Sequence, residues 1–515
     1  MQNMKRPEIQ IRAVLLCLLF FLFYIFLAVN YPVAYWIDAH LRLAQRDHIF
    51  IGYWLPTIQV LVYTAAKPAD SLLLLRIILS LISATVLFCA YYLANRLFPT
   101  SSVAGILALV LLGANLMYTA LATVPYPEVL FIGFMFLALI CLEDPQNQRL
   151  FYLAALSLNL ACLTRYEGWL LAGILVSEEV MRYVKSKSLR GFIPMAGRLV
   201  LFSFAPLVWV VFVVIEPGGL VGRLDGILNF TTGLTSATLT DRFFTRLNFE
   251  YISAFTNNFF HLLNWQLGKG IMVFGLIGMM VALQPSIKRF LHIRILGFLM
   301  LDLLLIAFWG PWDFTNLRQT FILNVFLIFY AAYGLEQSIK FIFQATTAVL
   351  ERSRSSITLQ LNSVSFAVII FVISIYVPSS IEFVDKTSHE VKFFVPAENG
   401  SWLNSHLSAN DAILVLSDDP FQIHALAAYI PVPLDSILDD RFDDQLQISR
   451  LNTTNQTYVV SLYGSKEGLS AGEANLLAHL ENGTIPAFSH EVAGRKIWVL
   501  PSDSLVDYFS LEKSE

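Results

Sequence analysis

Apolar stretches of membrane-spanning length recur along the chain from residue 11 to residue 377, with more polar segments between them. A helix needs about 20 apolar residues to cross a hydrocarbon core about 30 Å thick. The pattern therefore predicts about eleven transmembrane helices. These cover residues 11–30, 71–95, 103–122, 127–143, 149–164, 168–182, 199–215, 270–284, 293–309, 319–336 and 358–377.

The stretch from residue 149 to residue 182 is interrupted by the polar sequence "TRYEG". As a single helix it would be roughly 50 Å long, which exceeds the thickness of the hydrocarbon core. We therefore predict two short spans that turn at Arg165 and Glu167, with Gly168 easing the turn. Residues two apart point to different sides of a helix, so the spacing predicts a separate partner for each charge.

Basic residues in the connecting segments predict the orientation of these helices. The first span follows Lys5 and Arg6 and lacks a small-residue cleavage site, which is typical of a retained signal anchor with a cytoplasmic amino terminus. Alternate connections then carry Arg96, Arg149, Arg182, Lys185, Lys187, Arg190, Lys288, Arg289, Arg294, Lys340, Arg352 and Arg354. The positive-inside rule places them in the cytoplasm. We expect a prokaryotic plasma membrane, with the endoplasmic reticulum as the open alternative.

Composition agrees with an integral membrane protein and removes other classes. Hydrophobic residues make up 56% of the chain and charged residues 14%, and the mean hydropathy is +0.63. Soluble proteins carry about a quarter charged residues. The net charge of -4, without a basic block, excludes nucleic acid as a partner. All four cysteines lie in apolar segments, which argues against a disulfide framework.

The pattern predicts two regions, namely an α-helical polytopic membrane module at 1–377 and a small extracytoplasmic α/β domain at 378–515. The module includes a first outer loop at 31–66, with interfacial helices, and a long outer loop at 216–268. Glycines in the long outer loop motivate the hypothesis that it forms a mobile lid over the cavity. In the C-terminal domain, "DAILVLS", "TYVVSLYG" and "RKIWVLP" predict strands, whereas "WLNSHL", "PFQIHALAAY" and "AGEANLLAHLENG" predict helices.

Polar and aromatic residues collect in four outer connections, at one depth in the membrane. The candidate site residues there are Asp38, Arg42, Asp47, His48, Tyr126, Glu128, Arg165, Tyr166, Glu167 and Arg318. Charges inside a membrane protein usually mark a functional cavity. We therefore expect these residues to share one.

The chemistry of such a cavity follows from its side chains. A carboxylate can take a proton from a hydroxyl or an amine, and arginine can bind a phosphate through two parallel hydrogen bonds. A lipid with a phosphate ester fits both the arginines and the membrane. The sequence has no glycine-rich Walker loop, which argues against a soluble nucleotide as the donor.

These residues resemble the GT-C glycosyltransferases, membrane enzymes that use polyprenyl-phosphate-linked sugars, in the broad group of the protein O-mannosyltransferases and the aminoarabinose lipid A transferase. The resemblance covers roughly residues 10–340. It rests on the segments "YWIDAHLRLA", "GYWLPTIQVLVY", "PADSLLLLR", "LTRYEGWLL" and "NLRQTFILNVFLIFYAAYG". It implies a polyprenyl-phosphate-sugar donor, Asp38 as the catalytic base and Arg318 as a contact of the donor phosphate.

Other roles follow from the residues together with the resemblance. Arg165 is a second candidate phosphate ligand, and Glu167 is expected to position a neighbour or to touch the sugar. Many relatives have a second acid directly after the first, but Ala39 follows Asp38 here. Asp47 or Glu128 then supplies any second carboxylate. We assign no metal ligands, and a divalent metal cofactor stays open.

Alternatives remain at this stage. Asp38 also fits the N-cap of an interfacial helix. The acceptor is a protein, a lipid or a glycan, and membrane lipid is a further partner. The alternative function is a transporter or flippase of a lipid-linked sugar, for which broken helices and charges at mid-membrane depth are typical.

Overall fold

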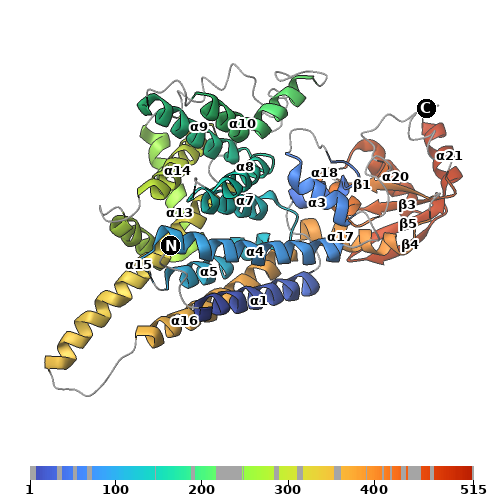
Figure 1. The fold of residues 1–515 in the computed structure, drawn as a ribbon. Coiled ribbons are helices and arrows are strands. Elements are labelled where there is room, and N and C mark those ends of the chain that lie inside the picture. The colour runs from blue at the N-terminus through green and yellow to red at the C-terminus, as the bar shows by residue number, and fades with distance from the viewer. Residues whose placement is uncertain are drawn as a thin grey trace. The chain divides into compact units, whose positions relative to one another are not determined.

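The fold is described by a computed structural model in which the chain forms two compact units (Figure 1). The first, called the membrane unit, comprises residues 1–27, 52–58 and 77–383, and the second, called the sheet unit, comprises residues 28–51, 59–76 and 384–515. The residues that the structure describes are 7–31, 37–49, 55–66, 72–101, 103–144, 147–186, 192–215, 246, 249–282, 289–309, 317–352, 361–389, 391–408, 411–417, 420–430, 437–438, 454–463 and 469–512.

Each predicted span contains a helix, so the prediction of a polytopic helical protein is confirmed. The helices are α1 (Pro7–Asn30), α4 (Leu72–Leu97), α5 (Ala104–Gly113), α6 (Leu116–Leu121), α7 (Pro127–Cys141), α8 (Gln148–Cys162), α9 (Glu167–Ser186), α10 (Phe192–Ile215), α13 (Phe249–Ala282), α14 (Arg289–Trp309), α15 (Leu317–Arg352) and α16 (Leu361–Ser388). Within the described ranges, seven helices are long and apolar enough to cross a membrane.

The predicted span 103–122 is two helices rather than one, which corrects the sequence reading. Helix α5 ends at Gly113, and α6 begins at Leu116. Asn115 between them accepts hydrogen bonds from the backbone N–H groups of Met117 and Tyr118, both at 3.1 Å. Asparagine is a strong N-cap residue because its side chain satisfies N–H groups that have no helical partner. Asn115 therefore ends one helix and starts the next within an otherwise apolar stretch.

Helix α13 also contains a break, at Gly268, where φ is 76° and ψ is 150°. That backbone conformation favours glycine, which has no Cβ. The predicted span began at residue 270, and the helical segment before the break occupies residues that were predicted as part of the outer loop. Residues 216–245, with the glycines that motivated a lid, lie outside the described part of the chain.

Helices α13 and α15 approach one another through glycines. A Cβ built on Gly278 would overlap the backbone carbonyl of Tyr330, and one built on Gly334 would overlap that of Phe274. Small residues at such positions let two membrane helices pack backbone against backbone. This contact holds α13 against a helix whose described middle part is largely buried.

In the sheet unit, five strands are present among the described residues, in the order β2-β1-β3-β5-β4. They are β1 (Ala412–Leu416), β2 (Ile437–Leu438), β3 (Gln456–Ser461), β4 (Phe488–Val492) and β5 (Arg495–Pro501). Strand β1 pairs in parallel with β2 and β3, whereas β5 pairs antiparallel with β3 on one side and with β4 on the other. The helices are α2 (Ile37–Ala44), most of α3 (Thr57–Ala66), α17 (Val391–Asn404), α18 (Pro420–Ala427), α20 (Ala471–Glu481) and α21 (Ser502–Glu512).

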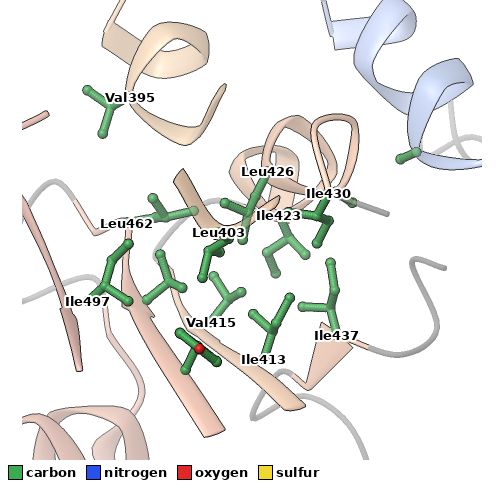
Figure 2. Packing of buried hydrophobic residues seen from close by; sticks show 14 residues of the cluster. Val395, Leu403, Ile413, Val415, Ile423, Leu426, Ile430, Ile437, Leu462 and Ile497 are labelled. Carbon is green, nitrogen blue, oxygen red and sulfur yellow. The ribbon is translucent and has the colours of Figure 1, made fainter. Parts of the chain in front are cut away.

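Successive residues of the strands face opposite sides of this sheet. Ile413 and Val415 of β1 pack with Leu426 of α18 in one apolar cluster (Figure 2). Leu414 lies between them in sequence and packs with Leu477 of α20 in a second cluster. Both clusters are buried, so the unit is a three-layer α/β arrangement with a core on each side of the sheet. The predicted α/β fold of the C-terminal region is confirmed.

Candidate functional site

The turn that was predicted at "TRYEG" is present and tightly built. Helix α8 ends at Cys162, and α9 begins at Glu167. The backbone N–H of Arg165 donates to the carbonyl oxygen of Ala161 at 3.0 Å. A Cβ on Gly168 would lie only 2.8 Å from backbone atoms of Ala161 and Cys162. The glycine therefore permits α9 to start directly against the end of α8.

A segment of the first predicted outer loop holds this turn from the other side. Thr57 donates to the carbonyl oxygen of Leu163 through its backbone N–H at 3.2 Å and through its hydroxyl at 2.9 Å. Leu55 packs with Trp209 and Trp169 in a small apolar cluster. All of these residues belong to the membrane unit. The turn is thus fixed by hydrogen bonds and by aromatic packing.

Arg165 pairs with two carboxylates, which corrects the prediction that Arg165 and Glu167 do not pair with one another. The Nε of Arg165 donates to Oε2 of Glu167 at 3.0 Å, and Nη2 donates to Oε1 at 2.5 Å. Nη1 donates to Glu128. The prediction failed because Arg165 precedes α9, so the angular spacing of helical residues does not apply to it.

The ion pairs of Arg165 are shielded from solvent. Its side chain is 12% exposed and that of Glu128 is fully buried. Glu128 lies in the first turn of α7, after Pro127, where the positive end of the helix dipole favours a carboxylate. Three N–H groups of one guanidinium are therefore directed at two acids from different helices. Such a pairing joins α7 to the start of α9.

The two tyrosines predicted beside these charges differ in exposure. Tyr126 directly precedes α7 and is buried. Tyr166 is 40% exposed, and its ring lies edge-on to that of Trp169, with centroids 5.2 Å apart. Trp169 is itself fixed, because its indole N–H donates to the carbonyl oxygen of Cys162 at 3.1 Å. Tyr166 is thus an accessible aromatic ring next to a buried ion pair.

Sequence reasoning missed one acid of this site, Asp302 of α14. Its side chain is buried, and it lies close enough to Glu167 and Arg165 to interact with their charges. The available signal was an aspartate in the middle of the apolar sequence "GFLMLDLLLIAF". A charged residue inside a predicted span is a functional candidate in its own right. We call Glu128, Arg165, Glu167 and Asp302 the Arg165 cluster.

The remaining predicted residues occupy other positions. Asp38, Arg42, Asp47 and His48 belong to the sheet unit. Asp38 is the second residue of α2, in its first turn, rather than the residue before the helix. Arg42 is buried, whereas Asp47 and His48 are exposed. Arg318 lies in the first turn of α15, and its side chain is outside the described part of the structure.

Helix α2 is anchored to the C-terminal part of the chain within the sheet unit. The guanidinium of Arg46 donates to the carbonyl oxygen of Ile430 at 2.6 Å and to that of Ala428 at 3.4 Å. The ring of His40 lies 5.9 Å from that of Tyr429. The candidate base Asp38 is therefore carried by a helix that packs on α18. This contact had no signal in the sequence, because it joins residues almost 400 positions apart.

No protein-family model matches the chain, and no curated protein sequence matches it. Solved structures do match. The structure of ArnT from Cupriavidus metallidurans bound to undecaprenyl phosphate aligns with a TM-score of 0.58 at 12% identity, over 94% of this chain and 97% of that one. The chain has the GT-C fold. The apo structure of the same ArnT gives a TM-score of 0.53 at 12% identity, over 91% and 94% of the two chains.

A third match is the oligosaccharyltransferase AglB from Archaeoglobus fulgidus, in complex with an inhibitory peptide and a dolichol-phosphate. Its TM-score is 0.44 at 12% identity, and the alignment covers 86% of this chain and 69% of that one. The GT-C fold, with its polytopic helical membrane part and its small C-terminal sheet, is the fold class that the sequence predicted.

Proposed function

We propose that this protein is a glycosyltransferase that moves a sugar from a polyprenyl-phosphate-linked donor to an acceptor on the extracytoplasmic face of the membrane. The observation that carries the proposal is the Arg165 cluster, a buried group of charges in a membrane fold shared with ArnT. ArnT was solved with undecaprenyl phosphate bound. A lipid-linked donor suits both a helical membrane unit and polar groups that can bind a sugar. The amino terminus is then cytoplasmic.

In the proposed reaction Asp38 acts as the general base. Its carboxylate takes the proton from a hydroxyl or amine of the acceptor, and the freed electron pair forms a bond to the anomeric carbon of the sugar. The bond from that carbon to the phosphate oxygen breaks, and its electron pair leaves with polyprenyl phosphate. Attack from the opposite side of the ring inverts the configuration. Arg318 stabilises the negative charge on the leaving phosphate.

The contacts of Arg165 favour a different role from the phosphate ligand of the sequence-based prediction. Its guanidinium is directed at the carboxylates of Glu128 and Glu167. A phosphate would have to displace one of these carboxylates to bind it. We therefore propose that Arg165 holds the acids in place, and that Arg318 is the main phosphate contact.

The experiment compares Asp38→Asn with Asp503→Asn in purified full-length protein. Asp503 is an exposed acid of α21 in the same unit and serves as the matched control. Transfer is measured from undecaprenyl-phosphate-linked mannose, glucose, galactose and arabinose to a peptide, a lipid A and an oligosaccharide. Loss of a general base lowers the rate by about 10²- to 10⁴-fold, with unchanged melting temperature. Full transfer activity of Asp38→Asn would contradict the assignment of Asp38 as the general base.

A flippase is the second candidate, and the break of α13 at Gly268 favours it, because broken helices are typical of transporters. In this case the wild-type protein transfers no sugar, but it moves undecaprenyl-phosphate-linked sugar across the bilayer of a proteoliposome. Accessibility of the labelled sugar to an added membrane-impermeant oxidant measures that movement and separates the two functions.

A further inference from the structure

Asp302 faces the turn between α8 and α9 because of the way α14 packs on α9. Near the other end of α9, Arg294 of α14 pairs with Glu178 at 2.8 Å. A Cβ on Gly297 would lie 3.8 Å from the side chain of Ile174. The two helices therefore run antiparallel in a continuous register. Asp302 lies about one turn and a half beyond Gly297 along α14. The antiparallel register therefore brings Asp302 to the first turn of α9, at Glu167.

Burial leaves this carboxyl group short of partners. Asp302 is 1% exposed, and among the described residues its Oδ2 has no hydrogen-bond partner. A buried acceptor without a donor is costly, and most such groups in folded proteins are satisfied by protein, water or ligand. The guanidinium of Arg165 lies nearby but already donates to Glu128 and Glu167. Asp302 therefore needs a donor from outside these side chains.

The charge of the cluster limits what that donor can be. Among the described residues, the guanidinium of Arg165 donates to Glu128 and Glu167, so a phosphate would have to compete with these carboxylates for it. Within the described ranges there is also no group of three His, Cys, Asp or Glu side chains arranged to hold a metal ion. Neutral hydroxyl groups donate hydrogen bonds without adding negative charge. A sugar carries several of them.

An aromatic ring next to the cluster fits the apolar face of a sugar. Tyr166 directly follows Arg165 in the turn and is 40% exposed, and Trp169 supports it from one side. Aromatic rings combine an apolar face with a polar edge, which suits a ligand that has both. Carboxylates and an accessible ring therefore lie together in the membrane unit.

We propose that the Arg165 cluster is the sugar-binding subsite of the protein, and that Asp302 selects the donor by accepting a hydrogen bond from a hydroxyl group of its sugar. This inference rests on the proposed function, since it names the group of the lipid-linked donor that this subsite contacts. Glu128 and Glu167, held by Arg165, supply the neighbouring acceptors.

The test measures dissociation constants of purified full-length protein for two kinds of probe. One probe is undecaprenyl phosphate, and the other is undecaprenyl phosphate linked to mannose, glucose, galactose or arabinose. The wild type is expected to bind at least one sugar-linked lipid more tightly than undecaprenyl phosphate. Asp302→Asn should weaken that binding about tenfold or more and leave undecaprenyl phosphate within about twofold. Ile306→Val, one turn further along α14 and also buried, is the matched control and should change neither.

Other outcomes overturn the inference. They are equal weakening of both probes by Asp302→Asn, no effect on either, or a wild type that does not distinguish sugar-linked lipid from undecaprenyl phosphate. Should Asp302→Asn fail to fold, Asp302→Glu makes the same comparison, because it keeps a carboxylate and shifts it by one methylene. A wild type that binds sugar-linked lipid through Asp302 but transfers no sugar refutes the proposed transferase and leaves the subsite intact.

Discussion

Helices α9 and α14 carry charged residues at both ends of their contact, and the two ends differ in the sign of their excess charge. At one end lies the Arg165 cluster, with one arginine and three acids among the described residues. At the other end, which we call the Arg294 cluster, the described residues include three arginines and two acids. Its members are Glu178, Glu179, Arg182, Arg198 and Arg294.

The hydrogen bonds show why this difference matters. In the Arg294 cluster, Glu178 accepts from Arg294 at 2.8 Å and Glu179 accepts from Arg182 at 2.7 Å, so each acid has a cation of its own. Glu179 also lies 3.3 Å from Arg198. At the Arg165 end, in the part of the chain that the structure describes, one guanidinium donates to both Glu128 and Glu167. A cation-rich cluster can join helices by itself, whereas an acid-rich buried cluster needs donors from elsewhere.

The largest effect is expected from Arg165→Leu, which removes the cation from the acid-rich end. Glu128 and Glu167 would then lie in a shielded site without their guanidinium, and breaking a buried ion pair in this way costs about 3–5 kcal/mol of folding free energy. Denaturant titration in detergent measures the loss. Arg165→Lys should fall between this variant and the wild type, because lysine keeps the charge but lacks the planar fork. Wild-type stability of Arg165→Leu contradicts the assigned pairing.

A smaller loss is expected from Arg294→Gln at the cation-rich end. Glu178 would lose its shortest ion pair but keep Arg182 at 3.4 Å. A hydrogen bond to a charged group contributes about 1.5–3 kcal/mol, so the stability should fall by no more than that. The same titration applies. A loss as large as that of Arg165→Leu would mean that Arg182 does not compensate for the lost partner of Glu178. The two clusters would then not differ in how they tolerate loss of an arginine.

The geometry of the turn can be tested separately from its charges. Gly168→Ala places a methyl group 2.8 Å from the backbone of Ala161 and Cys162, and should cost about 1–3 kcal/mol through overpacking. Gly173 of the same helix has open space around its Cβ position. Gly173→Ala should be neutral or stabilise by up to about 1 kcal/mol, because alanine is the better helix former. Equal melting temperatures for both variants would argue against the close approach of α8 and α9.

The smallest effect is expected from Arg182→Ala. Its side chain is 46% exposed, and Glu179 keeps Arg198 as a second partner. Exposed ion pairs contribute about 0.2–1 kcal/mol or less. Among the arginine variants the stability should therefore change least here, and the small loss should shrink further at high salt. A drop comparable to that of Arg294→Gln would show that the exposed arginine, and not the buried one, holds this end together.

Local pattern was enough to predict most elements, because apolar runs and alternation reflect what each segment must bury. The spans, the turn at "TRYEG" and strands β1, β3 and β5 were all found in this way. Strand β4 was missed because its first four residues are exposed and show no apolar alternation. The hairpin between β4 and β5 has its turn at Ala493 and Gly494, both with positive φ. Alanine rarely adopts positive φ, so the sequence did not indicate a hairpin turn there.

Contacts between individual side chains had no such local signal. Arg165 and Glu167 were judged by helical spacing, yet the pair forms because the chain is turning there. Asp302 joins the same cluster from α14 through the antiparallel packing of α14 on α9. Likewise, the anchoring of α2 by Arg46 depends on carbonyl groups of Ile430 and Ala428.

The sequence by itself determined which segments form the apolar helices, which form strands β1, β3 and β5, and which residue types were available for chemistry, since hydrophobicity and spacing act over a few turns. Only the tertiary structure decided which charges meet. Ion pairs depend on the distance and burial of side chains brought together by packing. The sequence contains an aspartate inside an apolar span, but its place beside Arg165 and Glu167 depends on the register of two helices.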